Sequence, residues 1–193
     1  MNRPVPAVML TMLLFVAGLA GCSNESSDKS ETKETPPPVS FAEPAASGVQ
    51  PAAVTYDTAL VPTAGTATTR TEVDGGKTTV VLTVAGLAPE RDYGAHVHTK
   101  PCGAKPADSG PHYQHKQDPV TPSTDPAYAN DKNEAWLDFT TDAQGAATAE
   151  ATVDWKFRDG EANATVIHET HTATHHGKAG TAGDRLACIT AEF

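Results

Sequence analysis

The sequence predicts an all-β fold, an antiparallel β-sandwich or barrel that carries two long loops. After residue 50, short runs rich in β-branched residues recur, and turn signals built on Gly and Asp separate them. No stretch in this part of the chain has the apolar periodicity of an amphipathic helix. About seven or eight short strands with regularly spaced turns are typical of sandwiches and barrels.

The N-terminal residues 1–22 predict an exported lipoprotein. Arg3 precedes a mostly apolar run over residues 7–20, which has the length of a signal-peptide core and is too short to span a bilayer comfortably. The run closes on Leu19-Ala20-Gly21-Cys22, which resembles a bacterial lipobox, where the cysteine is lipidated and becomes the mature N-terminus. The alternative is an ordinary secretory signal with an incidental cysteine. We expect a lipid anchor at Cys22 that holds the protein on a membrane outside the cytoplasm.

Residues 23–50 predict a disordered tether. They are rich in Ser, Glu, Thr and Pro and contain one aromatic residue, Phe41. Such a composition cannot bury enough apolar surface to offset the entropy of ordering. One folded domain is expected over residues 51–193. The formal net charge of the chain is −10, which argues against nucleic-acid binding because that function needs a basic patch.

The expected strands follow one another through the domain. They cover residues 53–56, 78–84, 94–98, 135–141, 147–157, 164–168 and 187–193. Asp74-Gly75-Gly76 is a turn signal before the second strand, and Asp142-Ala143-Gln144-Gly145 joins the fourth and fifth as a hairpin. Two long loops remain, residues 99–133 and 169–184. Long loops inside a compact domain are usually functional or tied down, so we expect these two to carry the chemistry.

The histidines and cysteines indicate a metal site and a disulfide. His96 and His98 are two residues apart on an expected strand, so both imidazoles point to one face and can bind one metal ion. Alone, such a pair could equally be two surface histidines. The chain has 3 cysteines. If Cys22 is lipidated, Cys102 and Cys188 remain, and one disulfide is the simplest expectation in an oxidising compartment, against two free thiols.

Five motifs occur in order along the domain. They are Gly94-Ala95-His96-Val97-His98, Cys102, Gly110-Pro111-His112-Tyr113, Val166-Ile167-His168-Glu169 and Gly183-Asp184-Arg185-Leu186-Ala187-Cys188. In this order they resemble the landmarks of the copper/zinc superoxide dismutases, and the resemblance covers roughly residues 51–193. It implies a Greek-key β-sandwich and an enzyme that converts superoxide to dioxygen and hydrogen peroxide by cycling copper between Cu(II) and Cu(I).

The resemblance also implies the copper ligands. His96, His98 and His168 would bind copper alone. His112 would be the bridging histidine, which the family shares between copper and zinc and which leaves copper on reduction and supplies a proton. Four imidazole nitrogens suit Cu(II).

Arg185 and the two cysteines have counterparts in the family as well. Arg185 would attract and dock superoxide, against the alternative of a structural salt bridge to Asp184 or to the loop. Cys102 and Cys188 would form the intrasubunit disulfide. The alternative function is a copper-binding lipoprotein on the same fold without useful turnover. The sequence makes no prediction of the oligomeric state.

Zinc is the uncertain cofactor. The family's zinc loop supplies two further histidines and an aspartate after the bridging residue, whereas here only His115 lies between His112 and the hairpin at Asp142. A zinc site could in principle combine His112 and His115 with carboxylates from Asp118, Asp125, Asp131, Glu134 or Asp138. The pattern more closely resembles the copper-only branch, where a protein group replaces zinc. Glu134 is our candidate for orienting His112, against an exposed acid at the start of a strand.

The second loop departs from the family pattern. It carries His171, His175 and His176 in place of a run of acids. These histidines could capture or load copper weakly, but we favour a solvated polar loop.

Overall fold

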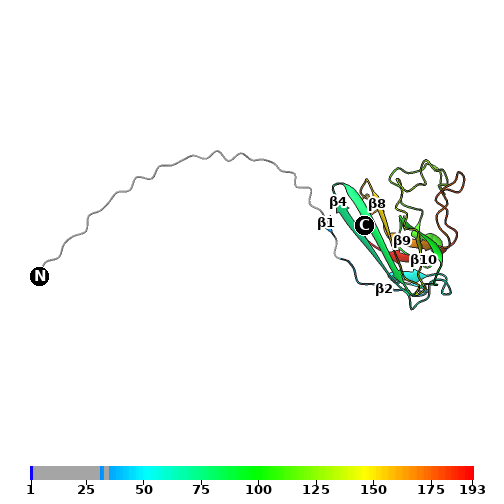
Figure 1. The fold of residues 1–193 in the computed structure, drawn as a ribbon, viewed down its shortest axis with the longest axis horizontal. Helices are drawn as coiled ribbons and strands as arrows, with labels where there is room; N and C mark the ends of the chain where they lie inside the picture. The colour runs from blue at the N-terminus through cyan, green and yellow to red at the C-terminus, as the bar shows by residue number, and fades with distance from the viewer. Residues whose placement is uncertain (2–30, 33–34) are drawn as a thin grey trace.

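The computed structural model describes residues 1, 31–32 and 35–193. Within these residues the chain forms antiparallel strands and one 3-10 helix, with no α-helix, and two sheets pack face to face (Figure 1). No helix of the described part is long and apolar enough to cross a membrane. The all-β prediction is confirmed.

The first sheet is built around a long hairpin. Its strands are ordered β1-β4-β5-β8, with β2 also paired to β4. The bounds are β1 Glu31–Thr32, β2 Val39–Ser40, β4 Thr66–Asp74, β5 Lys77–Ala85 and β8 Ala147–Val153. Gly75 and Gly76 join β4 to β5 with φ angles of 55° and 83°. A two-residue hairpin turn with positive φ at both positions favours glycine.

The second sheet carries three of the four histidines expected to bind metal. Its order is β3-β10-β9-β6-β7. The bounds are β3 Ala53–Thr55, β6 Asp92–His98, β7 Phe139–Thr140, β9 Ala164–His168 and β10 Arg185–Thr190. β8 lies beside β5, and β9 lies beside β6, although other strands intervene in the sequence. These returns are connections of the predicted Greek-key type.

The core lies between the sheets, because alternate residues of each strand point inward. On β5, Val80, Leu82 and Val84 are buried in it. On β6, Ala95 and Val97 face the same core. The intervening residues of β6 point to the outer face of the second sheet, which the long loops cover.

Several predicted boundaries are wrong. Phe41 has only 2% of its surface exposed and belongs to the core, and Val39 pairs with Ala67 of β4. The folded part therefore begins by residue 39 rather than 51, because a single aromatic side chain anchors a segment of polar average composition. Cys22 and the other signal residues after Met1, with most of the first half of the predicted tether, lie outside the described residues.

The strand predictions also need correction. β4 is an unpredicted strand whose inward residues include the buried threonines Thr69 and Thr71, so the apolar alternation is missing from its sequence. Residues 135–138, 154–157 and 191–193 are not strand. The aromatic side chains of Trp155, Phe157 and Phe193 pack on the core without continuing a ladder. The two long loops are confirmed, over residues 99–138 and 169–184.

Candidate metal centre

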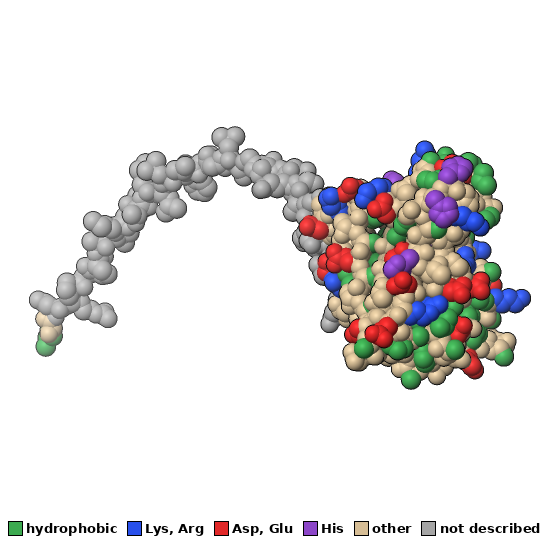
Figure 2. Space-filling view, turned by 45° about the vertical axis from the view of Figure 1, so that its right-hand side comes forward, with side chains coloured by type: hydrophobic (Ala, Val, Ile, Leu, Met, Phe, Trp, Pro, Cys, Tyr) green, Lys and Arg blue, Asp and Glu red, His purple; other side chains and the backbone are tan. Residues whose placement is uncertain are grey.

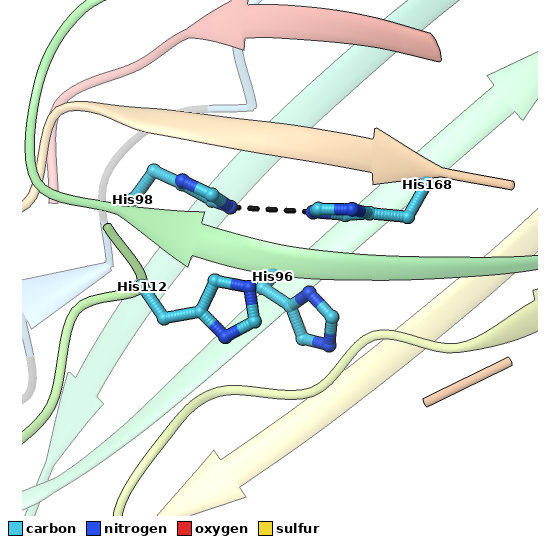
Figure 3. Close-up of side chains that lie close together, drawn as sticks. All are labelled: His96, His98, His112 and His168. Atoms are coloured by element: carbon cyan, nitrogen blue, oxygen red, sulfur yellow. Dashed lines mark hydrogen bonds between the residues drawn. The ribbon is translucent and has the colours of Figure 1, made fainter. Parts of the chain in front are cut away.

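Four histidines from three parts of the chain converge on the outer face of the second sheet (Figure 3). His96 and His98 come from β6, and His168 is the last residue of the neighbouring strand β9. His112 comes from the first long loop, which pairs with β6 through a bridge between His98 and His112. One ring nitrogen of each histidine lies within 4.8 Å of those of the others. The structure therefore brings together all four predicted ligands.

A hydrogen bond to one ring nitrogen of His98 leaves its other ring nitrogen free to face the cluster. His98 Nδ1 donates to the Gly110 carbonyl oxygen at 3.0 Å, which frees its Nε2. His98 Nε2 lies 3.3 Å from His168 Nε2. Two imidazole bonds of about 2.0–2.1 Å that meet at a near-tetrahedral angle place their nitrogens at this separation.

Burial keeps these histidines neutral. His96 and His98 are fully buried, which lowers the pKa of each well below 6.5, and the charge of neighbouring His112 lowers both further. Burial also lowers the pKa of His168 to about 3. Neutral imidazole is the form that binds metal ions. His96 Nδ1 is buried and has no hydrogen-bond partner among the described residues. A metal ion would satisfy it, so the residues fit copper.

Glu134 orients the ring of His112. Its Oε2 lies 2.9 Å from His112 Nδ1 and accepts a hydrogen bond from Trp136 Nε1 at 2.7 Å. Its Oε1 accepts another from Gln114 Nε2 at 2.7 Å. Glu134 is only 1% exposed, so the alternative of an exposed acid at a strand start is wrong. With Nδ1 held by this carboxylate, His112 presents Nε2 to the cluster.

Arg185 stands in the wall of the hollow above the histidines. The hollow measures about 730 Å³, and His112, His168 and Arg185 all line it. Arg185 Nη1 donates to the Pro106 carbonyl oxygen and to Ser109 Oγ, both at 3.0 Å. These partners belong to the 3-10 helix η1, Pro106–Ser109. The loop thus fixes the guanidinium. Burial lowers the pKa of Arg185, yet arginine stays charged in proteins.

The predicted disulfide is present. Cys102 and Cys188 are bonded, with their Cα atoms 5.6 Å apart. The bond joins the start of the first long loop to β10, the strand that begins at Arg185. It therefore holds the η1 segment close to the arginine that this segment orients.

The sequence matches the model of a known protein family. The model of the family described as copper/zinc superoxide dismutase (SODC) matches residues 63–190. The chain belongs to the copper/zinc superoxide dismutase family. No curated protein matches it significantly.

Solved structures of similar proteins include a superoxide dismutase and a SOD-like protein. Cu/Zn superoxide dismutase from Brucella abortus is 18% identical, with a TM-score of 0.49, over 65% of this chain and 88% of that one. A double mutant of a SOD-like protein from Bacillus subtilis is 16% identical, with a TM-score of 0.46, over 65% of this chain and 88% of that one.

The zinc site of the family does not fit these residues. His115 stacks on Trp155, with ring centroids 5.1 Å apart and planes 7° apart, and it does not belong to the histidine cluster. Within residues 31–32 and 35–193, the four histidines form the only group of three or more His, Cys, Asp or Glu side chains arranged for a metal ion. Asp118 instead accepts hydrogen bonds from its own loop. The geometry does not support the zinc role considered for His115.

The histidines of the second loop also lie outside the cluster. His171 donates from Nε2 to the Phe139 carbonyl oxygen at 3.1 Å, while His175 and His176 are exposed. Figure 2 shows histidine side chains at several places on the surface, among acidic and basic side chains. This arrangement agrees with the favoured interpretation of a solvated polar loop.

Sequence reasoning missed one contact to a predicted ligand. Thr172 Oγ1, from the second loop, lies 2.7 Å from His96 Nε2. Asp138, considered only as a zinc ligand, accepts hydrogen bonds from Thr172. A threonine among other polar loop residues carries no motif that could have revealed this contact.

Proposed function

We propose that this protein is a superoxide dismutase that uses copper held by His96, His98, His112 and His168. The observation that carries the proposal is the convergence of four imidazoles, two of which, His112 and His168, line a hollow whose wall also holds Arg185. Bound copper would supply one-electron chemistry, accepting an electron from one superoxide and donating one to the next. A protein that only stores copper has no need of a fixed arginine beside the ligands.

Arg185 draws superoxide into the hollow and docks it. The formal net charge of the chain is −10, so the average field repels an anion, and a local positive charge must overcome it. Two hydrogen bonds hold Nη1 in place. The remaining guanidinium N–H groups can then donate to a small anion at a fixed position.

His112 is our candidate for the proton step. Its side chain is 18% exposed, whereas His96 and His98 are 0% and His168 is 4% exposed. His112 therefore reaches the solvent of the hollow more readily than the other three histidines. Because Glu134 holds the ring through Nδ1, Nε2 can take up and release a proton without the ring losing its orientation.

We further propose that the enzyme works without zinc. This proposal is supported by the 2.9 Å contact of Glu134 Oε2 with His112 Nδ1, because a carboxylate there can orient the ring without a second metal ion. Its two other hydrogen bonds fix the carboxylate. If the protein purifies with one zinc per copper, and removal of zinc abolishes activity, this part of the proposal is wrong.

The extracytoplasmic location and the lipid anchor at Cys22 are proposals from the sequence motif. The Cys22→Ser substitution should release the protein from membranes. A mutant that fractionates with membranes as the wild type does would contradict the anchor.

The dismutase proposal is tested by copper loading and a superoxide assay. Wild-type protein with one copper per chain should accelerate superoxide decay far more than the same amount of chelated copper does without the protein. Protein that binds one copper with high affinity and gives no acceleration would instead be the copper-binding lipoprotein.

A further inference from the structure

We propose that Asp138 and Thr172 are positioning residues that set the tautomer of His96, so that its Nδ1 faces the histidine cluster as a bare lone pair. The inference deepens the proposed function, because it concerns how one copper ligand is prepared. It rests on a chain of three side chains from different parts of the fold.

The chain runs from the edge of the second sheet to the buried histidine. Asp138 directly precedes β7, and Thr172 lies on the loop between β9 and β10. Asp138 Oδ2 accepts the Thr172 backbone N–H at 2.7 Å, and Oδ1 lies 2.6 Å from Thr172 Oγ1. Thr172 Oγ1 in turn lies 2.7 Å from His96 Nε2. Each separation is that of a strong hydrogen bond.

Gly94 makes room for this contact. A Cβ atom there would lie 2.5 Å from the Thr170 carbonyl oxygen and 2.8 Å from the Ala182 Cβ. Gly94 lies on the same face of β6 as His96, two residues away. The absence of a side chain lets the loop lie directly against the strand, which brings Thr172 within reach of the ring.

The direction of each proton follows from the donors available. An ionised carboxylate can only accept hydrogen bonds, and a threonine hydroxyl has one proton to donate. At 2.6 Å from Oδ1, that proton must point to Asp138. Thr172 Oγ1 can then only accept from the ring, so His96 carries its proton on Nε2.

The remaining nitrogen of His96 is the one that the cluster uses. Neutral imidazole has a single N–H, so a proton on Nε2 leaves Nδ1 as an acceptor. Nδ1 is buried and has no hydrogen-bond partner among the described residues. His98 and His112 are held in the opposite sense, through Nδ1 to Gly110 and Glu134. The tautomer of His96 must therefore be fixed by other groups.

The Asp138→Asn substitution should reverse the direction of the two hydrogen bonds that Thr172 Oγ1 makes with residue 138 and with His96. Two backbone N–H groups face the side chain of residue 138, Thr172 N at 2.7 Å from Oδ2 and Ala95 N at 3.4 Å from Oδ1. The shorter bond is the stronger, so the amide oxygen of the new side chain should face Thr172 N. The amide NH₂ then faces Thr172 Oγ1 and donates to it. The hydroxyl proton turns to His96 Nε2, and the ring proton moves to Nδ1. This outcome is specific to a proton relay, since loss of packing alone does not exchange the two nitrogens.

The experiment compares four variants of the full chain with the wild type. ¹⁵N NMR of the metal-free protein reports which nitrogen of His96 is protonated. We expect Nε2–H in the wild type and in Thr172→Ser, which keeps the hydroxyl, and Nδ1–H in Asp138→Asn. Thr172→Val should lose the preference. The matched control is Thr140→Val, which removes a 2.6 Å hydrogen bond between an exposed threonine and Asp92.

Copper affinity gives the second readout. We expect a loss of about 10–100-fold for Asp138→Asn and Thr172→Val, as is typical when a partner of a metal-binding histidine is removed. Thr172→Ser should restore affinity close to that of the wild type, and Thr140→Val should not change it.

Two results would overturn the inference: Nδ1–H in the wild type, or Nε2–H retained in Asp138→Asn. Equal copper affinity in Thr172→Val and Thr140→Val would also contradict it. A wild type that binds no copper or has no dismutase activity would refute the proposed function instead. The tautomer is measured without metal, so it decides the inference in either case.

Discussion

Replacing Glu134 with alanine tests whether this carboxylate orients the ring of His112. The carboxylate accepts hydrogen bonds from His112, Gln114 and Trp136 at 2.9, 2.7 and 2.7 Å. Alanine leaves three donors without an acceptor. A buried unsatisfied donor costs about 1–3 kcal/mol. Glu134 borders the hollow, so water can replace part of what is lost. We therefore expect the free energy of unfolding of the metal-free protein to fall by about 3 kcal/mol.

The same substitution should weaken copper binding. Without the carboxylate, the ring of His112 is free to rotate and to exchange its proton between nitrogens. We expect a loss of about 10–100-fold in copper affinity, and a loss of dismutase activity that persists when the site is fully loaded. Zinc content should not change.

Urea denaturation of the metal-free protein and competition with a copper chelator measure the two effects. Glu150→Ala is the matched control, because Glu150 is an exposed glutamate on β8, and surface substitutions usually stay within about 0.5 kcal/mol. If Glu134→Ala unfolds like Glu150→Ala and binds copper as tightly as the wild type, Glu134 does not orient His112.

Four further predictions address the ligands, the anion site, the disulfide and pH. His168→Ala should abolish activity and weaken copper binding, whereas His176→Ala should do little; equal effects in copper titrations would contradict the ligand assignment. Arg185→Glu should lower the rate far more than the copper content, and salt should slow the wild type but speed the mutant, since the Debye length is about 10 Å at 0.1 M; identical salt dependence would exclude steering. Replacing Cys102 and Cys188 with serine should lower the free energy of unfolding by up to about 4.5 kcal/mol in the chain-entropy model, and a melting curve that matches the wild type would refute this. The pKa of His168 is about 3 in the folded protein and about 6.5 in the unfolded chain, so between these pH values the unfolded chain binds more protons. The metal-free protein should therefore lose stability as the pH falls below about 6.5. This loss should be smaller in the His168→Gln variant.

Strands marked by apolar runs of β-branched residues could be predicted from the sequence. β5 and β9 lie where the β-branched runs indicated. β4 could not be predicted, because two of its inward positions are threonines that gain their burial from the neighbouring sheet. The tether was extended too far for the opposite reason. Phe41 contributes little to an average composition, yet its burial holds the whole preceding strand β2 on the sheet.

The metal ligands could be predicted because they lie in short local motifs. Glu134 could be anticipated from its place where the long loop returns to the sheet. Thr172 could not, since its role depends on how closely a loop approaches β6, and that approach is set by Gly94 and the packing of Ala182. Contacts made by loop residues follow from the tertiary arrangement rather than from local sequence pattern.

The strand β6 faces the hydrophobic core with one set of residues and the metal centre with the other. Ala95 and Val97 fill the core, and His96 and His98 belong to the histidine cluster on the opposite side. Inserting or deleting one residue here would exchange the two sets, placing imidazoles among aliphatic side chains and small apolar groups at the copper position. Length changes inside this strand should therefore abolish both folding and metal binding at once. The exposed tip of the second loop, near Gly177, has open space around it and should accept additional residues far more readily.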